Sequence, residues 1–270
     1  MSGFLEEMAA ASTARLLAAK ALHAEGELQR RAQDRVPAPR LRLRGFDLIA
    51  ELKLRSPAAG ALRGRDEDLG ARVSAYARGG AAAVSVLTEP SRFDGALEHL
   101  ELAARALAPL DVPAMRKDFL VDPYQVLEAR AAGAGGVLVI LRMLSAAQID
   151  ALLDCARGLG MFVLLEAFDA ADIARMHDLV QAHAAHLQLL AGVNCRDLDT
   201  LQVVPARLLE LLPLLPRQVP RVAESGVASE EDARRVAGAG YELALIGSAL
   251  MRGGDPQGLV RSLLAAGRDA

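Results

Sequence analysis

Lysine is scarce in this chain of 270 residues: only three of the 31 basic residues are lysines. Two of them, Lys53 and Lys117, lie in short polar clusters at the ends of apolar, strand-like runs. An ammonium can give up and take back a proton, whereas a guanidinium stays protonated. Since the chain uses arginine almost everywhere else, these positions indicate two sites that need a titratable cation. The alternative is that both are ordinary surface lysines.

Aromatic residues are also few, at 3% of the chain with no tryptophan, while 52% of the residues are hydrophobic. The interior must therefore be built from Leu, Val, Ile and Ala, which suits buried parallel strands under Ala-rich helices. A net charge of −3 with both signs interspersed argues against a nucleic-acid or anionic-membrane partner. A small anionic ligand is compatible with this charge, because a local site need not follow the net charge.

Only two cysteines are present, Cys155 and Cys195, and they form neither a Cys-x-x-Cys pair nor a disulfide framework. This usage predicts a reducing compartment, the cytoplasm. No apolar run reaches about 18 residues, so no membrane-spanning helix is expected. The segment 1–22 is rich in Ala and Leu but has two early acidic residues and no cleavage site, which favours an amphipathic helix over a signal peptide.

Short β-branched or Leu-rich runs recur about every 20 to 30 residues, each followed by a polar loop and a longer helical pattern. Eight strands are predicted, at Asp47–Leu52, Ala83–Leu87, Val112–Arg116, Val137–Leu141, Phe162–Leu165, Leu189–Val193, Arg221–Ala223 and Leu243–Ile246. Predicted helices between them include Asp68–Arg78, Pro123–Ala132, Ala146–Leu159 and Ser229–Ala239. Several of these helices close on glycine just before the next strand, where a left-handed C-cap belongs.

Eight β-then-α units after a helical preface predict an α/β fold, a (β/α)₈ TIM barrel with an N-terminal helical extension. We expect a single domain over 1–270, with the extension at 1–45 and the barrel at 46–270. A doubly wound open sheet is the alternative, since strand closure cannot be read from one sequence. No GxGxxG follows the first strand, so a dinucleotide-binding fold has little support.

Polar residues stand where six of the eight predicted strands end, and in a barrel these ends meet at one mouth, where active sites lie. They are Glu51 and Lys53 with Ser56 and Pro57, then Arg116 to Phe119, Glu166, Asn194 with Arg196, Glu224 to Gly226, and Gly247 with Ser248. This arrangement predicts a single pocket.

Small residues follow the last two predicted strands, as Ser225-Gly226 and Gly247-Ser248. Loops at these two places commonly bind phosphate through exposed backbone N–H groups, and the hydroxyls add donors. Lys53 or Arg55 is available as the countercharge. The alternative is that both pairs only form tight turns.

The two lysines and two of the carboxylates, Glu51 and Glu166, form a mixed acid/base set in which burial and opposite charges can pull pKa values toward neutrality. Such a set suits proton transfer in carbonyl or dehydration chemistry. A Schiff-base lysine is the competing use. No metal site is predicted, because the histidines at 177, 183 and 186 fall in one helix-and-loop segment away from any strand end.

Six segments in chain order also carry a family resemblance: 49–53 with 56–57, 85–89, 116–119 with 122–125, 192–194 with 196–198, 223–226, and 247–252. Together they resemble indole-3-glycerol-phosphate synthases from about residue 46 to residue 256. The resemblance implies closure of 1-(2-carboxyphenylamino)-1-deoxyribulose 5-phosphate to indole-3-glycerol phosphate, with loss of carbon dioxide and water, in tryptophan biosynthesis. It implies no cofactor, and no obligate protein partner is inferred.

The resemblance implies a role for each matched residue. Lys117 is similar to the general acid that polarises the substrate carbonyl, and Glu166 to the base that assists loss of the ring proton and of hydroxide. Glu51 and Lys53 resemble the pair that binds the substrate and shares proton transfer, with Asn194 orienting it. The phosphate contacts correspond to Ser56, Ser225, Gly226, Gly247 and Ser248, and the pocket for the anthranilate ring and its carboxylate to Pro57, Phe93, Phe119, Arg196 and Leu198.

The chain departs from the family pattern at Ala58, Cys195 and Phe168, none of which replaces a matched acid or base. Its first 45 residues match poorly apart from Phe4 and Leu5. Two other interpretations remain at this point. One is another phosphate-binding barrel of the same pathway or of ribulose-phosphate metabolism, which typically carries Asp or Cys pairs or a metal cluster at its strand ends. The other is a non-catalytic barrel kept as a subunit or metabolite sensor.

Overall fold

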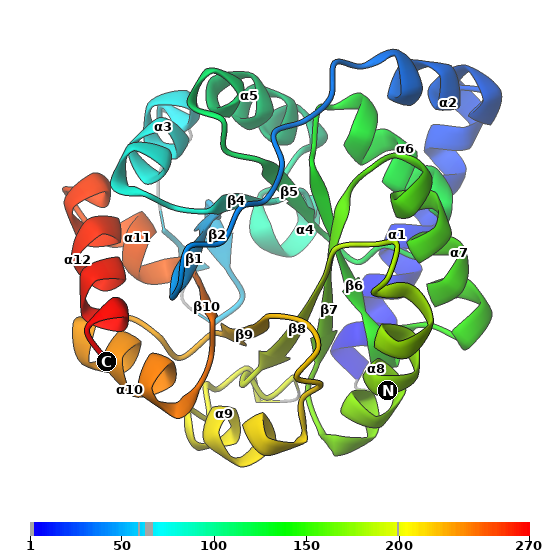
Figure 1. Cartoon of the computed structure of the whole chain (residues 1–270). Helices are drawn as coiled ribbons and strands as arrows, with labels where there is room; N and C mark the ends of the chain where they lie inside the picture. Colours follow the sequence, from blue (N-terminus) through cyan, green and yellow to red (C-terminus); the bar gives the residue numbers. More distant parts are fainter. Residues whose placement is uncertain (1–2, 59, 63–66, 199) are drawn as a thin grey trace.

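Eight parallel strands close into a barrel in the computed structural model, which describes residues 3–58, 60–62, 67–198 and 200–270 (Figure 1). The strands are β1 (Asp47–Leu52), β4 (Ala83–Leu87), β5 (Ala114–Lys117), β6 (Gly136–Ile140), β7 (Phe162–Ala167), β8 (Leu189–Asn194), β9 (Arg221–Glu224) and β10 (Leu243–Ile246). Each pairs with the next in chain order, and β1 pairs with β10 to close the ring. The prediction of a TIM barrel is confirmed, and the open-sheet alternative is wrong.

The strands are buried on both faces, which is why they read as apolar runs. Every residue of β1, β4, β6 and β7 is buried. The predicted bounds of β1, β4 and β10 agree with the structure, whereas β5, β7, β8 and β9 end one or two residues later than predicted. Lys117, Asn194 and Glu224 are consequently the last residues of their strands, and Glu166 is the last but one. The backbones of these four residues therefore belong to strands of the barrel and not to the loops that follow.

Helices cover the outside of the barrel between successive strands. They are α3 (Leu69–Gly79), α5 (Leu97–Leu107), α6 (Pro123–Ala131), α7 (Ala146–Gly158), α8 (Ala170–His183), α9 (Ala206–Leu211), α10 (Glu230–Ala239) and α12 (Pro256–Arg268). Ser229 and Asp232 form a capping box at the start of α10, and Gly80, Gly133 and Gly240 have left-handed backbones at the predicted helix ends.

Shorter elements lie at the strand ends. A hairpin of β2 (Arg55–Ser56) and β3 (Gly60–Ala61) follows β1, while α4 (Pro90–Phe93) follows β4 and α11 (Ser248–Arg252) follows β10. Three short 3₁₀ turns occupy Ala108–Leu110, Leu141–Met143 and Leu212–Leu214.

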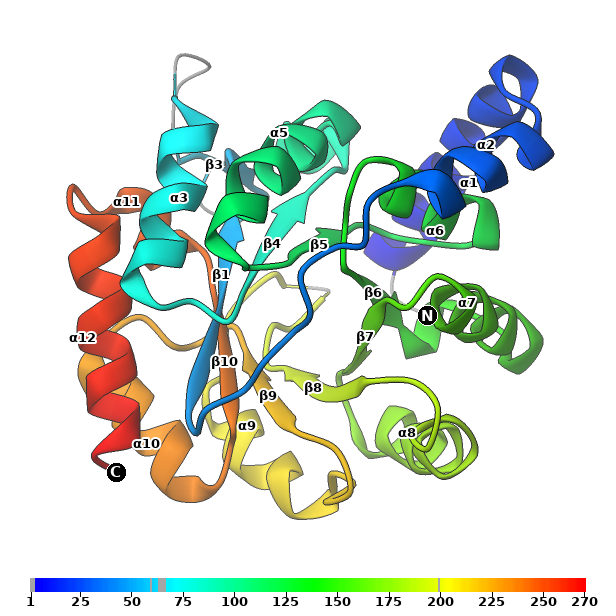
Figure 2. The same ribbon diagram turned by 45° about the horizontal axis from the view of Figure 1, so that its top comes forward.

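The N-terminal extension forms two helices, α1 (Gly3–Leu22) and α2 (Glu25–Asp34), which lie beside α6 (Figure 2). A separate hydrophobic cluster joins Leu16 of α1 and Leu28 and Ala32 of α2 to Tyr124 and Leu127 of α6. Burial of each large side chain of this kind contributes roughly 1.5–3 kcal/mol. The extension is therefore docked on the barrel, and the chain then crosses to β1 (Figures 1 and 2).

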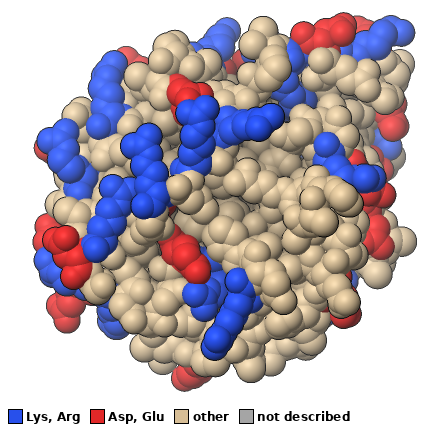
Figure 3. Space-filling view, viewed as in Figure 1, with Lys and Arg blue, Asp and Glu red and all other residues tan. Residues whose placement is uncertain are grey.

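None of the helices in the described ranges is both long enough and apolar enough to cross a membrane. Figure 3 shows Lys and Arg side chains over the upper and left parts of the face seen in Figure 1, with acidic side chains between and beside them. Ion pairs among the described residues include Arg42 with Asp111, Arg221 with Glu242 and Arg268 with Asp47.

Candidate active site

A cavity of about 460 Å³ lies at the carboxyl ends of the barrel strands. Its volume is in the range of small-molecule sites. Every residue to which the family resemblance gave a role lines this cavity, from Glu51 and Lys53 at β1 to Gly247 and Ser248 after β10. Arg116, also expected at the pocket, and Arg55, offered as a countercharge, do not line it. Glu224 also lines it, as do Phe4 and Leu5 of α1. The strand ends and one face of the N-terminal helix thus meet at a single mouth.

Two lysines pair with carboxylates in the cavity. Lys117 Nζ is 3.2 Å from Glu166 Oε1 and 3.5 Å from Glu224 Oε2, and Lys53 Nζ is 2.5 Å from Glu51 Oε1. The lysine side chains are only 13% and 11% exposed, and those of the carboxylates 4% or less. Lys53 and Lys117 are therefore not ordinary surface lysines.

The nearby charges control protonation at Lys117 and Glu51. Burial disfavours the ammonium of Lys117, but Glu166, Glu224 and Glu51 outweigh burial and raise its pKa. Burial likewise disfavours ionised Glu51, but Lys53 and Lys117 outweigh it and lower the pKa of Glu51. The expectation that burial and pairing would move these pKa values toward neutrality is wrong here, because the opposite charges are too close. Both groups are held in their charged forms.

Glu224 behaves differently from its neighbours. Neither of its carboxyl oxygens has a hydrogen-bond partner among the described residues, although Lys117 Nζ lies 3.5 Å from Oε2. Burial, followed by the charge of Glu166, raises its pKa well above the usual value. The Glu224 carboxyl group lies directly against Gly192 of β8. A Cβ on Gly192 would collide with Glu224 Oε1. Burial and the charge of Glu166 thus favour the protonated form of Glu224, whereas Lys117 favours the ionised form.

The sequence analysis placed Glu224 at a strand end but gave it no role. Like Glu166, Glu224 is a carboxylate near the end of an apolar strand, and this pattern in the sequence could have marked it as a site residue.

Asn194 connects the acid–base group to the loop after β9. Its Nδ2 donates to Glu166 Oε1 (2.9 Å), while its Oδ1 accepts from the Ser225 hydroxyl (2.9 Å) and the Arg196 backbone N–H (3.0 Å). Ser225 has a left-handed backbone with φ of 66°, which is uncommon for a residue other than glycine. The hydroxyl proton of Ser225 is thus directed to Asn194.

The expected phosphate end of the cavity contains Ser56, Gly226, Gly247 and Ser248. Helix α11 begins at Ser248, so the first N–H groups of this turn have no partner within the helix. A Cβ on Gly247 would collide with Glu51 Oε1 and lie 3.1 Å from Lys53 Nζ. Gly247 therefore lies against the Lys53–Glu51 pair as well as at the expected phosphate end.

Three aromatic rings form another part of the cavity wall. The ring of Phe119 lies 6.2 Å from that of Phe93 and 6.0 Å, edge to face, from that of Phe4. These separations are typical of favourable ring contacts. Because Phe4 belongs to α1, the N-terminal helix supplies part of the pocket wall, a contribution that the sequence analysis left open.

The three departures from the family pattern all lie at or near the cavity. Ala58 and Phe168 line it, and the Arg142 guanidinium stacks on Phe168 at 4.8 Å from the ring centre. Cys195 is buried behind Gly226, and burial raises the pKa of its thiol to about 11. The Cys195 thiol is therefore neutral near pH 7, which does not suit a nucleophile.

Comparison with known sequences identifies the family. A sequence profile of the family described as Indole-3-glycerol phosphate synthase matches residues 5–263. The indole-3-glycerol phosphate synthase of Kineococcus radiotolerans is 43% identical over 272 residues, covering 97% of this chain and 95% of that protein. The chain belongs to the indole-3-glycerol phosphate synthase family. The indole-3-glycerol phosphate synthase of a Parafrankia species is 44% identical over 239 residues, covering 87% of this chain and 85% of that protein.

Solved structures with much lower identity share the fold. A 3-hexulose-6-phosphate synthase from Salmonella typhimurium superposes with a TM-score of 0.61 at 16% identity, covering 82% of this chain and 97% of that one. A thiamine phosphate pyrophosphorylase from Pyrococcus furiosus superposes with a TM-score of 0.57 at 15% identity, covering 83% of this chain and 96% of that one. At this identity the likeness shows the barrel alone. The match to the indole-3-glycerol phosphate synthase family starts at residue 5 and so includes α1 and α2.

Proposed function

We propose that this chain closes the indole ring of its substrate through acid–base catalysis by Lys117 and Glu166. The reaction of the family converts 1-(2-carboxyphenylamino)-1-deoxyribulose 5-phosphate to indole-3-glycerol phosphate, carbon dioxide and water. The observation that carries the proposal is the Lys117–Glu166 pair, 3.2 Å apart, in a cavity with an aromatic end and an end rich in backbone donors.

Ring closure begins with a proton from the Lys117 ammonium to the ketone oxygen of the substrate. The ring carbon that bears the carboxylate attacks the activated carbonyl carbon, so a C–C bond forms as the ketone becomes a hydroxyl group. Loss of carbon dioxide returns the electron pair to the aromatic ring. A second proton lets the hydroxyl leave as water, and Glu166 removes one from the adjacent methylene. One proton is consumed overall, because a carboxylate leaves as neutral carbon dioxide.

Glu224 is assigned a supporting role in this scheme. Each anion beside Lys117 raises the pKa of the ammonium and makes it a weaker acid. A neutral Glu224 avoids a third full negative charge near Lys117 and supplies a proton next to Glu166. Glu51 and Lys53 bind the substrate and share in proton transfer, and Asn194 orients Glu166 and the substrate.

The two ends of the cavity suit the two ends of the substrate. The anthranilate ring is placed at Phe93 and Phe119 with Pro57 and Leu198, and its carboxylate at Arg196. The phosphate is placed at Ser56, Gly226, Gly247 and Ser248, with the backbone N–H of Ser225. Each step moves only protons, water and carbon dioxide, so the scheme requires no cofactor.

Two further assignments accompany this function. We treat residues 1–270 as one domain, because α1 and α2 pack on the barrel and contribute to the pocket. We also place the reaction in the cytoplasm, where the free thiols of Cys155 and Cys195 would stay reduced.

Turnover of the substrate by the purified protein tests the proposal. The indole product fluoresces, and the chain has no tryptophan to obscure it. We expect one carbon dioxide per indole formed, and loss of both signals in Lys117→Ala. A folded protein that binds the substrate without converting it would instead support the metabolite-sensor interpretation.

A further inference from the structure

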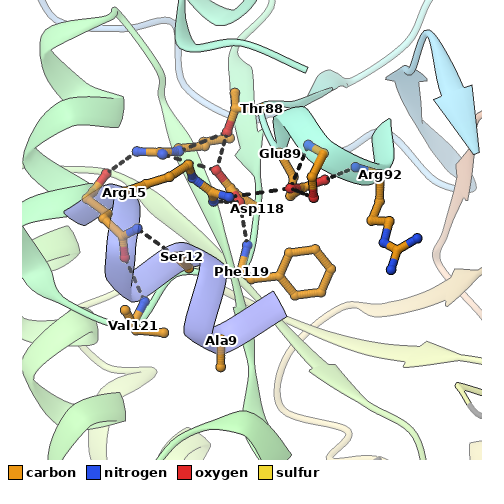
Figure 4. A network of polar contacts seen from close by, with 12 residues as sticks. Ala9, Ser12, Arg15, Thr88, Glu89, Arg92, Asp118, Phe119 and Val121 are labelled. Atoms are coloured by element: carbon orange, nitrogen blue, oxygen red, sulfur yellow. Dashed lines mark hydrogen bonds and ion pairs between the residues drawn. The ribbon is translucent and has the colours of Figure 1, made fainter. Parts of the chain in front are cut away.

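One arginine of the N-terminal helix joins two buried carboxylates at the barrel mouth (Figure 4). Arg15 Nη2 of α1 lies 2.7 Å from Asp118 Oδ1, and Nη1 lies 3.4 Å from Glu89 Oε1. The Asp118 and Glu89 side chains are 0% and 1% exposed, whereas that of Arg15 is 28% exposed. The Arg15 guanidinium, which we call the fork, therefore reaches from the surface of the N-terminal extension to Asp118, after β5, and Glu89, after β4.

Asp118 connects this fork to one aromatic ring of the pocket. Its Oδ1 accepts the backbone N–H of Phe119 at 2.8 Å. Its Oδ2 accepts the Thr88 hydroxyl at 2.6 Å and Arg116 Nη2 at 3.1 Å. Asp118 thus fixes the backbone of Phe119, two residues after the end of β5.

Glu89 connects the same fork to a second ring. It is the N-cap of α4 and accepts the backbone N–H groups of Ser91 at 2.8 Å and Arg92 at 2.7 Å. The helix is a single turn that ends at Phe93. Because the cap sets the start of so short a helix, Glu89 sets the position of Phe93.

The third ring of this aromatic wall, Phe4, belongs to the same helix as Arg15 and contacts Phe119. We propose that Arg15 is a positioning residue that sets the spacing of Phe4, Phe93 and Phe119 around the aryl group of the substrate. This inference rests on the proposed function, which places the anthranilate ring at that wall. The N-terminal helix is then a working part of the active site.

The fold does not depend on this fork. Asp118 and Glu89 each keep other donors without Arg15. Helix α1 keeps its buried Leu5, Met8 and Leu16, and Gln125 Nε2 donates to its Ser12 hydroxyl at 2.8 Å. Loss of Arg15 therefore releases the connection between two loops and α1, while the barrel and the helix stay packed.

The guanidinium geometry matters as well as the charge. A fork can hold two carboxylates at once, whereas a lysine ammonium acts as a single point charge. Arg15→Lys should therefore keep one contact and lose the other. Arg15→Met keeps the length of the side chain and removes both contacts.

Lys20 provides a matched control on the same helix. It pairs with Asp122 at 3.1 Å, in the same loop region after β5, but that aspartate caps α6 and holds no aromatic ring of the pocket. Lys20→Met therefore removes an ion pair between α1 and the barrel without touching the aromatic wall.

The test compares the wild type with Arg15→Met, Arg15→Lys and Lys20→Met. The substrate reduced at its ketone, which retains the aryl group but cannot close the ring, is titrated through its own fluorescence. Inorganic phosphate is measured as a competing ligand. For Arg15→Met we expect the Kd of the reduced substrate and the KM to rise about tenfold, the effect of losing roughly 1.4 kcal/mol, with phosphate affinity unchanged within about twofold. The Kd and KM of Arg15→Lys should lie between those of the wild type and Arg15→Met. The Kd and KM of Lys20→Met should match those of the wild type.

Three outcomes would overturn the inference: an unchanged Kd in Arg15→Met, an equal loss of phosphate affinity, or the same Kd increase in Lys20→Met. If Arg15→Met does not fold, the comparison of Arg15→Lys with Lys20→Met decides. Binding of the reduced substrate reports on Arg15 even if the wild type forms no indole, so failure of the proposed function is distinguishable from failure of this inference.

Discussion

Lys117 Nζ lies 3.2 Å from Glu166 Oε1, so the proposed acid and the proposed base are paired with each other. Pairing favours the protonated form of Lys117, which the mechanism requires of its acid. The ketone oxygen of the substrate must then accept the proton that Lys117 otherwise directs at the carboxylate. In the proposed mechanism, the acid and the base act on adjacent atoms of the same substrate.

Lys117→Arg should fail almost as badly as Lys117→Ala. Arginine keeps the charge beside Glu166 and Glu224 but is a poor proton donor, so kcat should fall by about two to four powers of ten. Steady-state kinetics with indole fluorescence measures the loss. Lys20→Arg is the control, because Lys20 lies outside the cavity lining and should tolerate the change. Most of the wild-type rate in Lys117→Arg would refute the acid role.

Gly247→Val should impair both binding and turnover. The new side chain would crowd the donors at the expected phosphate site, collide with Glu51 and approach Lys53. We expect KM to rise and kcat to fall about tenfold or more, and inorganic phosphate to compete with the substrate in the wild type. Gly254→Val is the control, since no atom lies within 4 Å of a Cβ there. Unchanged kinetics in Gly247→Val, with no phosphate competition, would remove the phosphate site from this place.

Glu224→Gln should flatten the dependence of stability on pH. The folded state keeps a proton on Glu224 that the unfolded state loses as the pH rises past about 4.5, so this group makes the protein less stable with rising pH until its raised pKa is passed. Glutamine cannot ionise. As the pH rises above about 5, the melting temperature of the variant should therefore fall less than that of the wild type. Glu231→Gln, on the exposed face of α10, controls for charge removal. Equal slopes for Glu224→Gln and the wild type would show that Glu224 is ionised.

The sequence predicted the barrel well because its physics is local and repetitive. Parallel strands buried on both faces become apolar runs, so the bounds of β1, β4 and β10 were predicted correctly. Strands β5, β7, β8 and β9 were predicted to end one or two residues too early. The reason is that polar residues at their ends, namely Lys117, Glu166, Asn194 and Glu224, resemble loop residues. Barrel topology alone then brought the strand-end residues to one mouth.

Other features depend on contacts that leave no periodic signal. The pKa directions at Lys117, Glu51 and Glu224 follow from which charges lie closest, and the sequence shows only that the charges exist. Arg15 reaches Asp118 across 103 positions in the chain. Such a contact depends on where α1 docks, which the extension's own pattern does not specify.

The central claim is that Glu166 acts in chemistry rather than in binding, and Glu166→Gln tests it most directly. Asn194 can still donate to the glutamine oxygen, so the shape of the site is retained while the proton acceptor is lost. With enzyme in excess over the substrate, we expect the single-turnover rate to fall by about a hundredfold or more while substrate affinity changes by less than about tenfold. Weak binding of the substrate, with the bound substrate still converted at the wild-type rate, would contradict the role of Glu166 as the base. Glu51 would then be the next candidate for the base.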